Sequence, residues 1–132
     1  MHPPKPTPPK PTEAELEILN VLWSRGPSTV REVHDEVSRH KPAHYTTVLK
    51  IMQIMAEKSL LRRDEKRRAH VYIATKPREW TQKQIAGDLL RRAFGGSARS
   101  LLMGALSARR ASKDELDSIR QLLDEYEKEN SK

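Results

Sequence analysis

The chain has 132 residues, of which 36% are hydrophobic and 33% are charged, and its formal net charge is +7. That length allows one ordinary domain, or a small domain with an appended oligomerisation segment, and excludes a large multidomain enzyme. The absence of cysteine excludes disulfides, thiolate metal sites and a cysteine nucleophile, and the basic balance favours an anionic partner.

The first eleven residues contain six of the nine prolines. This composition favours extended backbone and cannot bury a core, so residues 1–11 are predicted to be a disordered tail. The tail lacks the apolar stretch of a secretory signal, and no apolar run approaches the ~20 residues that cross a bilayer. We therefore expect a cytoplasmic protein without a membrane partner.

Two short helices are predicted next. Thr12 and Glu15 have the spacing of a capping box, and so do Thr29 and Glu32, whereas Gly26 and the proline after it end the first helix. The apolar positions at helical spacing are Leu16, Ile18, Leu19, Leu22 and Trp23 in the first helix, and Val30, Val33 and Val37 in the second.

A third helix is predicted from Tyr45 to Lys58, after Pro42 has ended the preceding segment. One face carries the apolar stripe Val48, Ile51, Met52 and Met55, and the opposite face carries Thr46, Lys50, Gln53 and Glu57. A hairpin follows, with strands at 60–63 and 69–74 and a charged turn at 64–68.

Three further helices are predicted in the C-terminal part. The fourth begins near Pro77 and is broken by Gly95 and Gly96, the fifth follows Ser97, and Ser112 caps the sixth. About fifty residues make a weak core alone, so their apolar faces are expected to pack on a second subunit. The residues assigned to this interface are Leu89, Leu101, Leu102, Leu106, Leu116, Ile119, Leu122, Leu123 and Tyr126.

Charge is distributed by segment. The net charge is −4 over residues 12–38, +6 over 39–75, +6 over 76–110 and −3 over 111–132. Three helices followed by a basic hairpin is the order of a winged helix-turn-helix, and phosphate would favour the basic third helix and hairpin over the acidic first two. The predicted fold is therefore mainly α with a small β hairpin, a DNA-binding domain at 12–75 and a helical dimerisation domain at 76–129.

The candidate DNA-binding residues follow from that assignment. Hydroxyl, ammonium and amide groups on the third helix can reach base edges or phosphates of DNA. The hairpin would lie along the sugar-phosphate backbone of the DNA. The recognition-helix candidates are Tyr45, Thr46, Thr47, Lys50 and Gln53. The wing candidates are Arg62, Arg63, Lys66, Arg67, Arg68 and His70.

Other classes of function have less support. Winged helices also serve as protein-protein interaction modules, so that reading stays open beside double-stranded DNA as the partner. His40 and His44 are four residues apart, but Pro42 disfavours the continuous helix that would align them on a metal. No catalytic residues, metal site or cofactor are predicted.

Several stretches match one bacterial family in register. They are 12–19 with Leu22 and Trp23, 30–33, 45–48, 58–60, Tyr72 and 94–97. From Thr12 to about Glu129 the chain resembles the penicillinase-repressor family, also called the BlaI/MecI/CopY family, of winged-helix repressors.

The resemblance implies a homodimer on a palindromic operator that represses genes, commonly those for β-lactam resistance and a linked sensor protease. It also implies cleavage in the C-terminal helices, which falls near Gly104 and Ala105 here. The chain departs from the best-known members because it lacks their Asn-Phe pair and has Ile54 in place of arginine and Ser59 in place of glycine. The family's copper-responsive branch uses C-terminal cysteines, which this chain lacks, so copper induction is not expected.

Overall fold

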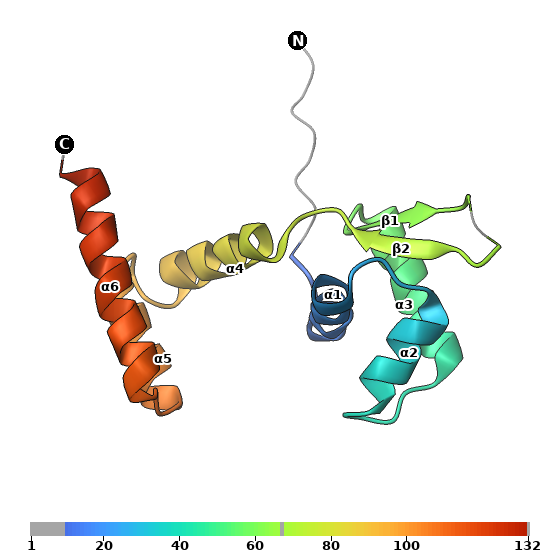
Figure 1. Ribbon diagram of the computed structural model, residues 1–132, viewed down its shortest axis with the longest axis horizontal. Helices are drawn as coiled ribbons and strands as arrows, with labels where there is room; N and C mark the ends of the chain where they lie inside the picture. Colours follow the sequence, from blue (N-terminus) through green and yellow to red (C-terminus); the bar gives the residue numbers. More distant parts are fainter. Residues whose placement is uncertain (1–9, 67, 132) are drawn as a thin grey trace, which may run out of the picture. The chain divides into compact units, whose positions relative to one another are not determined.

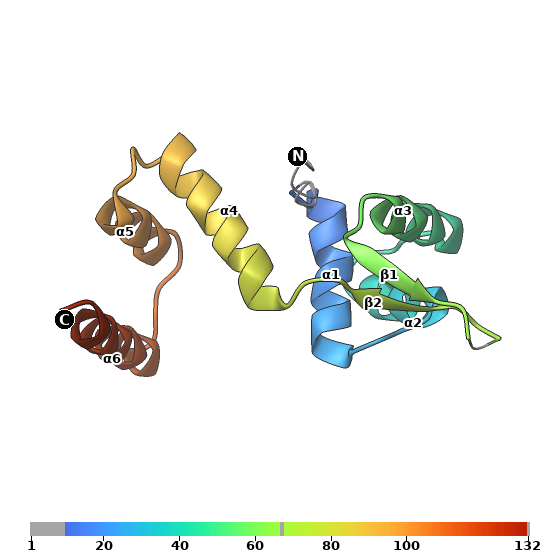
Figure 2. The ribbon, with the colours of Figure 1, turned by 90° about the horizontal axis from the view of Figure 1, so that it is seen from above.

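Figures 1 and 2 show the computed structural model, which describes residues 10–66 and 68–131. It is mainly helical with one two-stranded antiparallel hairpin, which confirms the predicted fold class. The predicted tail lies largely outside the described residues. The chain divides into two compact units between Ala86 and Gly87, eleven residues after the sequence-based domain boundary at 75.

The first unit contains the three helices α1 (Glu13–Arg25), α2 (Val30–Ser38) and α3 (Tyr45–Glu57). Both predicted capping boxes are present. The Thr12 side chain accepts from the Glu15 N–H while the Glu15 carboxylate accepts from the Thr12 N–H, and Thr29 and Glu32 repeat this arrangement. Each box satisfies backbone donors that a helix start leaves without partners, which explains why these helices begin where they do.

The hairpin follows α3 directly. The left-handed backbone of Ser59, with φ 66°, reverses the chain, and the Leu60 N–H donates to the Met55 carbonyl to close the helix end. Strand β1 (Leu61–Asp64) then pairs with β2 (Val71–Ala74). Both strands begin later than predicted, because Leu60 belongs to the helix ending and the residues at 69 and 70 lie outside the paired ladder.

The core of the first unit joins all three helices to the hairpin. Ser28, between α1 and α2, exchanges both backbone hydrogen bonds with Tyr72 of β2, which ties the helices to the wing. The buried apolar residues are Ile18, Leu19, Leu22, Val30, Val33, Val48, Met52, Met55, Leu60, Leu61 and Tyr72. Most of the apolar positions predicted for the first three helices therefore meet in one core.

A buried ion pair joins the start of α1 to the end of α3. Glu15 is 3% exposed, and its Oε2 accepts a hydrogen bond from Lys58 Nζ at 3.0 Å. Burial is the largest influence on the Glu15 pKa and acts to raise it. The hydrogen bonds from Thr12 and Lys58, together with the Lys58 charge, outweigh burial and hold that pKa below its usual value.

Glu15→Gln is expected to reduce the loss of stability in acid. A carboxyl whose pKa is lowered in the folded state stabilises the fold above its unfolded pKa, and that stability is lost as the pH falls through the folded pKa. Glutamine keeps the capping-box acceptor but cannot pair with Lys58, so we expect a free energy of unfolding about 1–2 kcal/mol lower at neutral pH.

Urea unfolding between about pH 6 and pH 3 measures this difference. The stability of the glutamine variant should fall less than that of the original chain over this range. Glu13→Gln, at an exposed position in the same helical turn, is the matched control and should leave the acid sensitivity unchanged. Parallel pH profiles for the Glu15 variant and the original chain would show that the ion pair does not contribute.

Helix α4 (Arg78–Arg92) begins in the first unit and continues into the second. Its start is attached to α1 by the Trp23 indole N–H, which donates to the Lys76 carbonyl at 3.0 Å, and by Arg78, which donates to Ser24 Oγ at 3.1 Å. The Arg78 guanidinium also lies 5.8 Å from the centre of the Trp23 ring. These contacts explain why the first unit extends beyond the predicted boundary.

The second unit adds α5 (Ala98–Ala108) and α6 (Lys113–Asn130). Ser97 and Ser112 cap them, each by accepting the N–H of the residue three positions later, at 3.1 Å. Among the described residues from 82 to 131, none is fully buried. The second unit therefore has amphipathic helices without an enclosed core of its own.

Candidate nucleic-acid interface

Helix α3 separates its residues into a buried and an exposed face. Val48, Met52 and Met55 are at most 3% exposed. The sequence-predicted recognition residues are all exposed, and they are Tyr45, Thr46, Thr47, Lys50 and Gln53. The helix is therefore held by its apolar side and presents hydroxyl, ammonium and amide groups outward, where base edges or phosphates could meet them.

Tyr45 is positioned by side chains from α2. Its ring meets the His34 ring edge-on with centroids 5.7 Å apart, and the Arg31 guanidinium lies 5.7 Å from its centre. His34 is held in turn by a 2.7 Å hydrogen bond between Nε2 and the Ala43 carbonyl. These contacts place the Arg31 charge beside the start of α3, and Tyr45 remains 40% exposed.

Arg31 is a candidate that the sequence analysis did not assign. Its own helix is acidic, and only its contact with Tyr45 shows that it belongs beside α3. The one feature of the sequence that could have indicated this role is its positive charge, which is opposite to that of Glu32 and Asp35. A guanidinium beside a helix N-terminus is well placed to bind phosphate.

The two arginines of β1 have different surroundings. Arg63 pairs with Tyr72 across the hairpin, and hydrogen bonds to Tyr72 and to Glu65 raise the pKa of Arg63 further above its usual value. Arg62 pairs with Ile73, so it lies on the other face of the ribbon. Arg63 is thus engaged within the wing, whereas the side chain of Arg62 has no hydrogen-bond or ion-pair partner among the described residues and is exposed.

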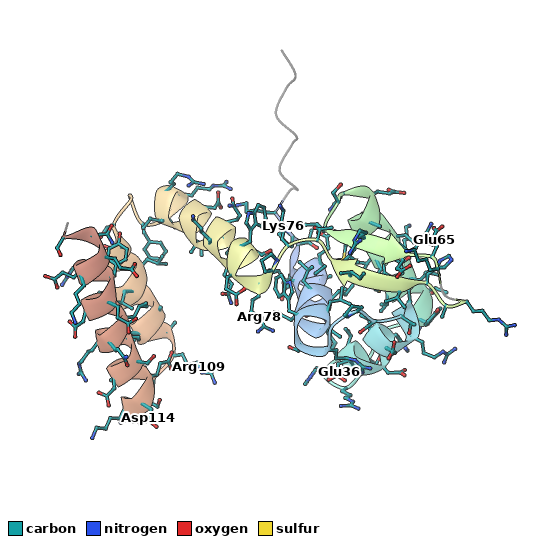
Figure 3. All side chains as sticks on the ribbon, turned by 45° about the horizontal axis from the view of Figure 1, so that its top comes forward. Glu36, Glu65, Lys76, Arg78, Arg109 and Asp114 are labelled. Atoms are coloured by element: carbon teal, nitrogen blue, oxygen red, sulfur yellow. The ribbon has the colours of Figure 1, made fainter. Side chains whose placement is uncertain are left out.

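The remaining wing candidates lie in the loop between the strands. Lys66, Arg68 and His70 are exposed, and the Lys66 N–H donates to Asp64 Oδ1 at 3.0 Å, which shapes the turn. Arg67 was also predicted to contact DNA, but it lies outside the described residues. Figure 3 shows the side chains of this region extending around Glu65.

A groove brings the recognition helix and the wing together. It is lined by Gln53 and Glu57 of α3 and by Arg62 and Arg63 of β1, with Ser59 between the two elements. Its charged lining consists of these two arginines together with Glu57 and Glu65, beside the Gln53 amide, which can read a base edge. The arrangement fits a nucleic acid that contacts helix and wing at once.

The residues predicted for dimerisation all lie in the second unit, in α5, α6 and the last part of α4. The most exposed are Leu89, Leu122, Leu123 and Tyr126, and the other five are partly buried. Met103, which the sequence analysis left out, is also exposed. Their place on the surface is consistent with an interface, and their role stays a prediction.

The predicted cleavage region lies inside α5. Gly104 is partly buried, and a Cβ added there would lie 3.3 Å from the Phe94 ring, whereas Ala105 is exposed. An extended substrate strand at this point would require α5 to unwind.

Other kinds of site have no support in the part of the chain that the structure describes. It contains no group of three or more histidine, aspartate or glutamate side chains that could hold a metal ion. It also contains no helix with the length and apolar character needed to span a bilayer.

Comparison with known proteins identifies a matching family and several relatives. A family described as Penicillinase repressor matches residues 11–125. The transcriptional regulator BlaI of Mycobacterium tuberculosis is 33% identical over 117 residues, which cover 87% of this chain and 83% of the relative. The penicillinase repressors of Bacillus licheniformis and Staphylococcus aureus are 23% and 18% identical, over 89% and 87% of this chain and 92% and 91% of their own lengths.

Proposed function

Because this chain belongs to the penicillinase-repressor family, we propose that it represses transcription as a homodimer on a two-fold symmetric operator. Repression of transcription follows from the family itself, whose members are repressors and not enzymes, and this confirms the prediction that the chain is not an enzyme. The homodimer, the symmetric operator and the residues assigned to them are the proposal. A repressor must be in the same compartment as the DNA that it binds, so the proposal includes a cytoplasmic location.

The observation that carries the proposal is the exposed polar face of α3 beside a basic wing. Lys50 and Gln53 extend from a helix whose opposite side is buried, and Arg62 lines the same groove as Gln53. A major groove admits one α-helix, and a neighbouring hairpin can then follow the phosphates. We assign base contacts to α3 and phosphate contacts to the wing.

Binding titrations at several salt concentrations test DNA recognition against the protein-interaction alternative. Full-length protein is titrated with a duplex selected by it from a random pool and with a scrambled duplex. Affinity for both should fall steeply between about 50 and 200 mM salt, because the protein releases counterions from phosphates. Equal affinity for the two duplexes would contradict operator recognition.

Two variants separate the assigned roles. Lys50→Ala should lower affinity for the selected duplex by about tenfold and affinity for the scrambled duplex less, because a base contact is worth ~1–3 kcal/mol. Arg68→Ala should weaken both nearly equally and reduce the salt dependence. Lys128→Ala removes the same charge from an exposed position in α6 and should change neither. If Lys50→Ala leaves both affinities untouched, α3 does not read the groove.

Proteolytic release near Gly104 and Ala105, by a sensor-linked protease, is the remaining part of the proposal. A glycine inside a helix costs about 1 kcal/mol relative to alanine, so α5 unwinds most easily there. Cleavage at this point would separate α6 from α4 and remove the most exposed apolar residues of the proposed interface.

A further inference from the structure

Ile54 is an apolar residue on the polar face of α3. Its side chain is 36% exposed, whereas the buried stripe of Val48, Met52 and Met55 is at most 3% exposed. Leu49 of the same helix is partly buried against the core, whereas Ile54 is one of the exposed large hydrophobic residues. About a third of Ile54 is therefore left on the surface of α3.

The position of Ile54 places it within the predicted groove contact. It lies four residues after Lys50 and seven after Thr47, which puts it on the same side of an α-helix as both. It also follows Gln53 directly. Lys50 and Ile54 are only about 6 Å apart along the helix axis, so a base edge within reach of one is close to the other.

We propose that Ile54 contacts the 5-methyl group of one thymine in each half-site and is a specificity-determining residue. The inference rests on the proposed function. Thymine is the one base with a methyl group in the major groove, and an apolar side chain is its complement. Against the other bases, Ile54 would cover donors or acceptors without satisfying them. Its β-branched side chain is stiff at χ1, so it loses little freedom on contact.

Replacement of thymine by deoxyuridine tests the contact, because it removes only the methyl group. Full-length protein is titrated with its selected duplex and with duplexes in which each thymine is replaced in turn. Burial of one methyl-sized group corresponds to about a fourfold change in affinity. We expect one position in each half-site where deoxyuridine weakens binding about fourfold, and about fifteenfold when both half-sites are changed.

Variants at position 54 then assign the effect to this side chain. Ile54→Ala should bind thymine and deoxyuridine equally at the sensitive position, and Ile54→Val should fall between it and the original chain. Lys128→Ala, at an exposed position in α6, is the control and should retain the fourfold preference. Circular dichroism checks that each variant is folded, and the valine change keeps the test available if the alanine variant unfolds.

The outcomes distinguish the inference from its premise. If the selected duplex is bound no better than a scrambled one, the proposed function is wrong. The thymine contact then fails with it, before any thymine is replaced. Specific binding with no sensitive thymine would overturn the contact alone. Sensitivity that persists in Ile54→Ala would assign the methyl group to another residue.

Discussion

Leu122→Glu combined with Leu123→Glu is expected to convert the proposed dimer to monomers and to weaken operator binding by about a hundredfold or more. The two leucines are 62% and 54% exposed in the single chain, so they are available to a second copy. In a two-fold interface each glutamate would be buried against the same surface of the partner, where unpaired charges are costly. Loss of the dimer also removes the high effective concentration at which the second DNA-binding domain meets its half-site. This effect is worth ~10²–10⁴ in affinity.

Sedimentation equilibrium measures the assembly, and titration with a symmetric duplex measures the binding. Gln121→Glu combined with Lys128→Gln is the matched control, since it changes the net charge equally but on the opposite face of α6. The control should stay dimeric. A leucine double variant that sediments as a dimer would show that α6 does not form the interface.

Insertion of about five base pairs between the half-sites is the second large effect that we expect, with a loss of about a hundredfold or more. A two-fold dimer must meet major grooves on one side of the duplex, and half a helical turn moves one half-site to the far side. The attachment of α4 supports this expectation. Hydrogen bonds from Trp23 and Arg78 hold the segment that leads into that helix on the first unit.

Titration with duplexes of increasing spacer length tests the prediction. Binding should recover in part near ten added base pairs, where the grooves face the same side again. Trp23→Phe combined with Arg78→Ala removes the hydrogen bonds of Trp23 to Lys76 and of Arg78 to Ser24, and should reduce the spacing penalty. If the original chain bound duplexes of all spacer lengths with the same affinity, the two DNA-binding domains of the proposed dimer would act independently.

Local sequence patterns determined most of the secondary structure. The two capping boxes, the glycine pair after α4 and the serines before α5 and α6 act over a few residues, so their effect is visible in the sequence. The stripe on α3 also predicted its buried side correctly, because helical periodicity decides which residues share a face. The exposed polar face of the candidate site followed from the same pattern.

Tertiary structure decided which of these charges and polar groups are engaged within the fold. Arg62 and Arg63 are adjacent in the sequence, yet only the Arg63 side chain is engaged, because the hairpin register places it opposite Tyr72 and it also pairs with Glu65. Arg31 joined the candidate site only through its approach to Tyr45. The contacts of Arg63 and Arg31 with the two tyrosines each join residues from separate elements, so local sequence patterns do not reveal them.

The same reason explains the boundary between the two units. A proline precedes α4 in the sequence and indicates where that helix begins. A local pattern of this kind does not show which residues elsewhere in the chain the helix contacts. The hydrogen bond from Trp23 to the Lys76 carbonyl joins residues 53 positions apart. Sequence alone thus determined the elements and their faces, whereas contacts between distant residues decided that the start of α4 belongs to the first unit.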